Sequence, residues 1–170
     1  MYEFEHHKPA SVADAASAMK GADDGKLLAG GQTMIPTLKQ RLASPSDLVD
    51  LGGIAELKGI TVSGGTITIG AMTTHAAVAA SAEIKSALPA LAELADHIGD
   101  AQVRNRGTIG GSVANNDPAA DYPAACLALG ATIHTSQRDI AADDFFTGLF
   151  ETALEEDEII TKVSFPVASK

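Results

Sequence analysis

The most regular alternation of apolar and polar residues in the chain lies between residues 60 and 70. Residues 60–63 and 66–70 each alternate aliphatic with hydroxyl side chains, and Gly64-Gly65 separates the two runs. Alternation with a period of two is typical of a half-buried strand, and a two-residue glycine turn matches the twist of a hairpin. The pattern therefore predicts an antiparallel β-hairpin here.

Helical spacing predicts an element that begins after Ser11. Apolar side chains recur at Val12, Ala15, Ala16 and Met19, which places them on one face of a helix. The Ser11 hydroxyl can cap this helix, with the carboxylate of Asp14 three residues on. Similar reasoning predicts helices at 35–41, 74–79, 88–98 and 121–129.

Short apolar runs predict the remaining strands, at 2–5, 26–29, 47–51, 132–135 and 159–165. The stretch from residue 143 reads as irregular, and the acidic residues 155–158 read as a solvated turn. Mixed helices and strands with one clear hairpin favour an α+β class over a regular βαβ repeat. We expect two lobes, an N-terminal lobe of residues 1–55 and a second lobe of residues 56–170.

Charge and cysteine content restrict the function. The formal net charge of −10 argues against nucleic acids and anionic membrane surfaces as partners, because both select basic patches. Cys126 is the only cysteine, so neither an intrachain disulfide nor a cysteine-ligated metal cluster can form. We predict no metal site in this chain. The absence of a leader-like start and of an apolar span of roughly 18 residues predicts a cytoplasmic protein.

Two glycine-rich runs, far apart in the sequence, are the strongest candidates for chemistry. The first is Leu28-Ala29-Gly30-Gly31-Gln32-Thr33-Met34, and the second extends from Arg106 to Asn115 with Gly107, Gly110 and Gly111. Glycine weakens helices and strands, so we expect loops. Backbone N–H groups without a neighbouring Cβ can approach an anion closely. We predict that the two loops meet and hold one diphosphate, without the Gly-x-Gly-x-x-Gly fingerprint of the Rossmann fold.

These runs resemble the two flavin-binding motifs of one enzyme family. Ala29-Gly30-Gly31-Gln32-Thr33 and the run from Gln102 to Ser112 are similar to those of the medium subunit of molybdenum hydroxylases. That family includes aerobic carbon monoxide dehydrogenase and the xanthine dehydrogenase flavin domain. Asn115 to Asp121 and Asp157-Glu158-Ile159-Ile160 extend the resemblance over nearly the whole chain, and the pattern is most similar to the carbon monoxide dehydrogenase branch.

The resemblance implies a fold and a cofactor. The fold is the p-cresol methylhydroxylase/vanillyl-alcohol oxidase type of FAD-binding fold, with a small N-terminal α/β lobe and a larger lobe around a mainly antiparallel sheet. FAD would stretch between the lobes. The adenine-diphosphate side would be lined by Lys26, Leu27, Leu28, Ala29, Gly30, Gly31, Gln32 and Thr33. The pyrophosphate and ribityl oxygens would be held by Gly107, Thr108, Ile109, Gly110, Gly111 and Ser112.

Four further residues receive roles from the same resemblance. Asp121 would accept hydrogen bonds from a ribose or ribityl hydroxyl, and Ile160 would lie near the adenine through its backbone. Ile98 and Gly99 would approach the isoalloxazine. No residue is assigned a catalytic role, since the flavin ring carries the electron chemistry.

The implied function is electron transfer within a larger complex. A substrate would be oxidised at a molybdopterin cofactor in a large subunit, and electrons would pass through iron–sulfur clusters in a small subunit to FAD here. An external acceptor would then receive them, and the heterotrimer would dimerise. The alternatives are a self-contained flavin oxidase or dehydrogenase and a cofactor-free assembly fragment. Family members carry a further C-terminal domain that closes over the flavin ring, and this domain is expected to be absent from a chain that stops at Lys170.

Structural readings remain open beside the functional ones. Asp121 can cap the following helix, and Arg104 and Arg106 fit solvated side chains or surface ion pairs. The remaining candidates, read as structural or exposed, are His75, His97, His134 and the apolar-face Cys126.

Overall fold

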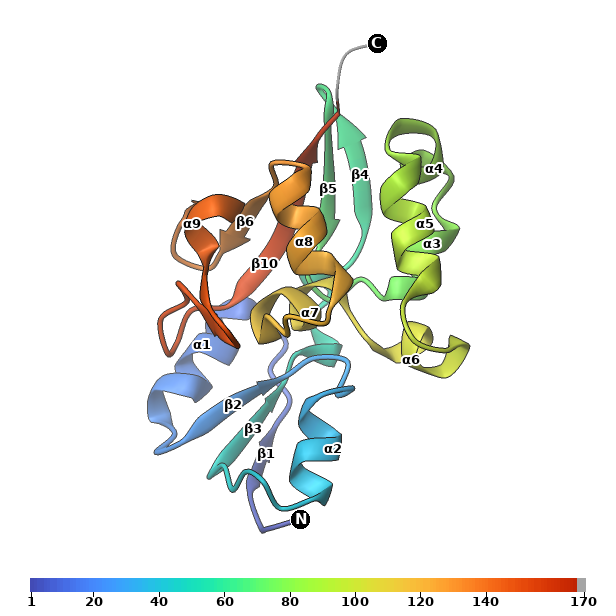
Figure 1. The fold of residues 1–170 in the computed structure, drawn as a ribbon. Coiled ribbons are helices and arrows are strands. Elements are labelled where there is room, and N and C mark those ends of the chain that lie inside the picture. Colours follow the sequence, from blue (N-terminus) through green and yellow to red (C-terminus); the bar gives the residue numbers. More distant parts are fainter. Residues whose placement is uncertain (168–170) are drawn as a thin grey trace.

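The chain folds around two sheets of different type that lie end to end, with helices packed along their sides (Figure 1). The computed structural model describes residues 1–167. The N-terminal sheet has three parallel strands, and the second sheet has five antiparallel strands. This is the α+β arrangement that the sequence predicts. The division of the chain into lobes at residue 55 stays a prediction.

The N-terminal sheet has β3 (Asp47–Asp50) in the centre, with β1 (Glu5–His7) and β2 (Gly25–Leu28) on either side. Helix α1 (Val12–Gly21) packs against β2 and β3, and α2 (Met34–Lys39) follows β2. The Ser11 hydroxyl accepts a hydrogen bond from the N–H of Asp14, as its N-cap position predicts. The first glycine segment, residues 29–33, therefore lies between the end of β2 and the start of α2.

The second sheet begins with the predicted hairpin, β4 (Ile60–Ser63) and β5 (Thr66–Gly70). Both turn glycines have positive φ, 57° at Gly64 and 75° at Gly65, which the tight turn requires and which a Cβ would disfavour. The central strand β10 (Ile160–Pro166) pairs with β5 and with β6 (Thr132–Thr135), and β7 (Asp139–Ala141) forms the far edge. Buried cross-strand pairs such as Val163 with Ile69 fix its register.

Helices cover the second sheet and connect its strands. They are α3 (His75–Ala80), α4 (Ala82–Ala87), α5 (Pro89–His97), α6 (Ala101–Arg106), α7 (Ile109–Asn115), α8 (Asp121–Ala128) and α9 (Ala142–Phe145). Short connecting elements are the 3₁₀ turns Leu51–Gly53 and Ala55–Leu57 and the strand pair β8 (Phe146–Gly148) and β9 (Glu151–Thr152). Helix α7 packs against β5 and β10 and lies where the two sheets approach each other (Figure 1). Within residues 1–167 no helix has the length and apolar character needed to span a membrane.

Each sheet has its own hydrophobic core, and two residues join the cores. The N-terminal cluster contains Ala15, Val49 and Leu51, and also Met72, which follows β5, and Ile159, which precedes β10. Ile159 is fully buried and directly precedes β10. The segment before β10 is therefore anchored in the N-terminal core and in the second sheet at once.

Two local predictions outside the candidate site differ from the structure. The first strand covers Glu5–His7 and not residues 2–5, because parallel pairing with Asp47–Val49 sets its position and His7 Nε2 lies 2.6 Å from Asp47 Oδ1. The alternation of apolar and acidic side chains over residues 2–5 is too short to set the position of a strand, so the pairing with β3 sets it. The stretch from residue 143 is not irregular, since it holds α9 and the β8–β9 pair around the buried Phe145.

Candidate functional site

A cleft of about 850 Å³ separates the N-terminal sheet from α7 and from the segment before β10. Ligand sites in proteins typically measure about 300–1,000 Å³, so the cleft can hold a sizeable small molecule. Both predicted glycine segments line it. Their lining residues are Ala29, Gly30, Gly31, Gln32, Thr33, Gly107, Thr108, Gly110, Gly111 and Ser112.

The two glycine segments touch each other directly. A Cβ built on Gly30 would overlap the carbonyl oxygen of Arg106 and would lie 2.8 Å from the Cα of Gly107. A Cβ on Gly111 would lie 3.5 Å from that of Ala29. Backbone atoms can approach this closely only where side chains are missing. The tertiary fold thus brings together two runs that are more than seventy residues apart in the sequence.

The second glycine segment is not the loop that its composition predicts, because Ile109–Asn115 forms helix α7. Thr108 caps the helix, and its hydroxyl accepts a hydrogen bond from the N–H of Gly111 at 3.2 Å. Gly110 donates its N–H to the carbonyl of Ala71 at 2.9 Å, and a Cβ there would lie 2.6 Å from the Cβ of Ala71. Close packing on Ala71 requires glycine here and outweighs its poor helix propensity.

The two segments offer different hydrogen-bonding groups to the cleft. Four amides at the start of α7 are occupied. Ile109, Gly110 and Ser112 donate to the carbonyls of Thr73, Ala71 and Thr108, and Gly111 donates to the Thr108 hydroxyl. In the first segment the N–H groups of Gly30, Gly31, Gln32 and Thr33 make no hydrogen bond within residues 1–167. The Ser112 hydroxyl is likewise without a partner in that range. An anion would therefore find free amides on the 29–33 side and a free hydroxyl on the α7 side.

The charges that line the cleft do not favour an anion. Lys20 and Lys26 are the lining cations among the described residues, and each is already paired. Lys20 Nζ lies 3.1 Å from Asp157 Oδ2, and Lys26 Nζ lies 2.7 Å from Asp24 Oδ1. Unpaired carboxylates lie on the rim as well, including Asp23. A phosphate here would depend on neutral N–H and O–H donors, while carboxylates suit sugar hydroxyls.

His75 forms part of the inner wall and is uncharged at neutral pH. Only 5% of the surface of His75 is exposed, and this burial lowers the pKa of its imidazole to about 4. The ring lies 5.4 Å from that of Tyr122, centroid to centroid, and its Nε2 faces Gly107. His75 Nδ1 and the Tyr122 hydroxyl are buried and have no hydrogen-bond partner among residues 1–167. Burial also raises the pKa of the Cys126 thiol to about 12, so that thiol is inert.

Most of the predicted site residues line the cleft, including Lys26, Leu27 and Ile160 in addition to the glycine segments. Five do not: Leu28, Ile98, Gly99, Ile109 and Asp121. Ile109 is fully buried in the core, and Leu28 is the last residue of β2. The carbonyls of Ile98 and Gly99 accept hydrogen bonds from Arg104 Nη1 at 3.2 Å each. Asp121 is the exposed first residue of α8, directly after Ala120, which lines the cleft.

Sequence reasoning missed one wall of the cleft. Residues 154–159 line it together with Ile160, and Glu158 is buried. The interpretation of residues 155–158 as a solvated turn is therefore wrong for Glu158, whose carboxylate is paired inside the protein. The available signal was the resemblance of Asp157-Glu158-Ile159-Ile160 to the family, directly before the last strand. No sequence pattern indicated the other missed group, which includes Lys20, Asp24 and His75.

Comparisons with known proteins identify a family. The family described as the FAD binding domain in molybdopterin dehydrogenase matches residues 2–168. The carbon monoxide dehydrogenase medium chain of Hydrogenophaga pseudoflava is 42% identical over 168 residues, which cover 96% of this chain and 58% of that protein. The nicotine 6-hydroxylase medium subunit of Paenarthrobacter nicotinovorans is 40% identical over 167 residues, which cover 96% of this chain and 59% of that one.

A solved structure agrees with the sequence relatives. Carbon monoxide dehydrogenase from Hydrogenophaga pseudoflava, in a form that lacks the Mo-pyranopterin moiety of its molybdenum cofactor, superposes with a TM-score of 0.95 at 42% identity. The match covers 98% of this chain and 60% of that one. The chain thus spans about three fifths of the length of the relatives that it matches. It belongs to the family of FAD-binding domains of molybdopterin dehydrogenases and has the α+β FAD-binding fold of their medium subunits.

Proposed function

We propose that the chain binds FAD in the cleft between its two glycine segments and serves as the electron-transfer flavin module of a molybdenum hydroxylase. The direct contact of Gly30 with Arg106 and Gly107 is the observation that carries the proposal. It supports one ligand that touches both segments. The cofactor belongs to the family, whereas the residues that hold it are our assignment.

The residues present fit FAD. The free N–H groups of residues 30–33 would hold the diphosphate from one side, and the hydroxyls of Thr33 and Ser112 would add neutral donors. The backbone at Ile160 would face the adenine, as the resemblance implies. Asp121 is exposed and follows Ala120 of the cleft, which suits its predicted role toward a sugar hydroxyl. The roles of Ile98 and Gly99 toward the isoalloxazine stay predictions.

Bound FAD would supply the exchange of electrons between one-electron and two-electron partners. The chain's own part is to bind and orient it. The uncharged His75 would add no positive charge beneath Gly107, so the diphosphate would depend on backbone amides. Because Lys20 and Lys26 are paired and further carboxylates such as Asp23 line the cleft, the charged side chains would add no net attraction for the diphosphate.

The proposed partners are an iron–sulfur small subunit and a molybdopterin large subunit, in a heterotrimer that dimerises. Electrons would enter from the small subunit and leave to an external acceptor. The two relatives described above are named after different substrates, carbon monoxide and nicotine. Their sequence identities to this chain are nearly equal, 42% and 40%. This equality supports a module whose sequence is not tuned to the substrate, so carbon monoxide is one candidate among several.

Titration with FAD tests the proposal. We expect the purified chain to quench flavin fluorescence with one FAD per chain. Ser112→Ala removes one hydroxyl donor from the cleft and should weaken binding by about fivefold to tenfold, the equivalent of one hydrogen bond of about 1 kcal/mol or slightly more. Ser63→Ala removes an exposed hydroxyl of β4 outside the cleft and should bind like the wild type. A wild-type chain that leaves FAD fluorescence unchanged would refute the proposal.

A further inference from the structure

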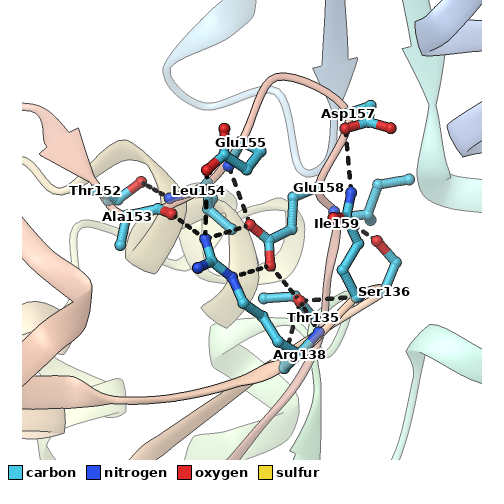
Figure 2. Close-up of polar contacts among 11 residues, drawn as sticks. Thr135, Ser136, Arg138, Thr152, Ala153, Leu154, Glu155, Asp157, Glu158 and Ile159 are labelled. Carbon is cyan, nitrogen blue, oxygen red and sulfur yellow. Dashed lines mark hydrogen bonds and ion pairs between the residues drawn. The ribbon is translucent and has the colours of Figure 1, made fainter.

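Glu158 carries the most heavily hydrogen-bonded carboxylate in the described part of the chain (Figure 2). Arg138 donates to it from Nε and Nη2, at 3.0 Å each, so the guanidinium approaches both carboxylate oxygens. Thr135 donates its hydroxyl at 2.6 Å, and the backbone N–H of Glu155 donates at 3.0 Å. The Glu158 side chain has no exposed surface. Four donors on one buried carboxylate define its position closely.

The hydrogen bonds overcome the cost of burying this charge. Burial raises the pKa of Glu158, but the donors from Arg138, Thr135 and the Glu155 amide outweigh it and hold the pKa below its usual value. The carboxylate is therefore ionised at neutral pH. The ion pair is buried on the Glu158 side alone, since the Arg138 side chain keeps 47% of its surface exposed. A pair that is open to solvent on one side contributes modestly to stability, and what the four donors add is a defined position for the carboxylate.

The network fastens the wall of the cleft to the turn between β6 and β7. Arg138 also donates to the carbonyl of Ala153 at 2.6 Å. Ser136 exchanges two hydrogen bonds with the backbone of Ile159, at 2.8 and 3.1 Å. Gln137 donates to Asp157 at 3.1 Å. Residues 153–159 are thus attached at successive points to residues 135–138, none of which lines the cleft.

The same wall reaches across to the N-terminal sheet. Asp157 accepts from Lys20 of α1, and Ile159 is buried in the N-terminal core. Lys20 and residues 154–160 all line the cleft. The width of the cleft at this end therefore depends on how the wall is held.

We infer that Glu158 and Arg138 are positioning residues for the adenosine half of the cofactor. The inference rests on the proposed function, in which Ile160 faces the adenine. The bidentate pair orients the backbone of residues 155–160, and the wall then presents Ile160 to the ligand at a fixed distance from residues 26–33. Neither Glu158 nor Arg138 takes part in electron transfer.

Three ligands separate a positioning role from a general loss of fold: FAD, ADP for the adenosine half, and FMN for the other half. Glu158→Gln places an uncharged amide of nearly the same volume opposite Arg138 and the Glu155 N–H. We expect the dissociation constants of FAD and ADP to rise about tenfold or more. FMN binding should change less than about twofold. Arg138→Lys keeps the positive charge but cannot form the bidentate pair with the carboxylate. It should raise the dissociation constants of FAD and ADP by a smaller factor than Glu158→Gln does.

Asp139→Asn is the matched control, since it removes a carboxylate of β7 whose partner is His134 and which does not line the cleft. It should bind all three ligands like the wild type. Unchanged FAD and ADP binding in Glu158→Gln, or an equal loss for FMN, overturns the inference while leaving the proposed function intact. Failure of the wild type to bind FAD overturns both.

Discussion

Gly30 and Arg106 are in direct backbone contact: the space for a Cβ on Gly30 is filled by the carbonyl oxygen of Arg106. The contact joins the loop after β2 to the end of α6, and it sets the separation of the two glycine segments. Everything proposed for the cleft depends on this separation.

Gly30→Ala should therefore push the segments apart. We expect it to lower the free energy of unfolding by about 1–3 kcal/mol, as overpacking of a filled site does, and to weaken FAD binding. Urea unfolding and FAD titration measure the two effects. Gly21→Ala is the control, because nothing lies within 4 Å of its added Cβ at the end of α1. Wild-type stability and affinity in Gly30→Ala would show that the contact can relax.

Gly110→Val should act through packing and not by blocking the ligand. Its Cβ would point at Ala71, 2.6 Å from that Cβ, in a buried position of α7. We expect a loss of about 3 kcal/mol or more, seen as a lower midpoint of urea unfolding with or without FAD. Ser112→Ala, on the same helix, should retain wild-type stability and lose only affinity. A stable Gly110→Val chain that fails to bind FAD would instead place the side chain in the ligand's path.

His75 should make the fold sensitive to mild acid. The native pKa of about 4 lies below the ordinary value of 6.5, so the unfolded chain binds a proton that the native chain does not. Stability from this residue is present above pH 6.5 and is lost as the pH falls toward 4, by about 2 kcal/mol between pH 7 and pH 5. Urea unfolding at the two pH values measures it.

The His75→Phe variant should remove that part of the pH dependence while keeping an aromatic ring against Tyr122. The exposed His97 gives the control variant His97→Gln, which should retain the wild-type dependence. If His75→Phe loses as much stability as the wild type on acidification, another group is responsible.

Tyr122→Phe should leave the protein as stable as before or raise its stability by up to about 1 kcal/mol. The Tyr122 hydroxyl is buried and makes no hydrogen bond to the described part of the chain, so its removal relieves a desolvation cost and loses no partner there. Urea unfolding compares it with Tyr2→Phe, which changes a tyrosine with 49% of its surface exposed. A loss above about 1 kcal/mol would reveal a partner for the hydroxyl, such as a buried water shared with His75 Nδ1.

Elements with a strong local signal were predictable. The β4–β5 hairpin and the Ser11 cap of α1 depend on residues close together in the sequence, and both occur as expected. The resemblance of the glycine segments led to the family, which the comparisons confirm. The weak local pattern at residues 2–5 did not predict the position of the first strand, because parallel pairing with β3 decides it.

Helix α7 shows why composition misled. Glycine at positions 110 and 111 disfavours a helix in isolation, but the cap at Thr108 and the contact with Ala71 stabilise one. The acidic turn before β10 gives the converse example. Nothing near Glu158 in the sequence indicates that Arg138, twenty residues earlier, lies within hydrogen-bonding distance.

By itself the sequence determined the kinds of residue available: glycines that admit close approach, a single cysteine, an acidic balance and strands and helices with local caps and turns. Only the tertiary structure decided which of these meet. The contact of Gly30 with Arg106, the burial of His75 and the fastening of Glu158 all join residues distant in the chain. Such contacts depend on how the sheets pack, and packing is a property of the whole chain that local propensity does not encode.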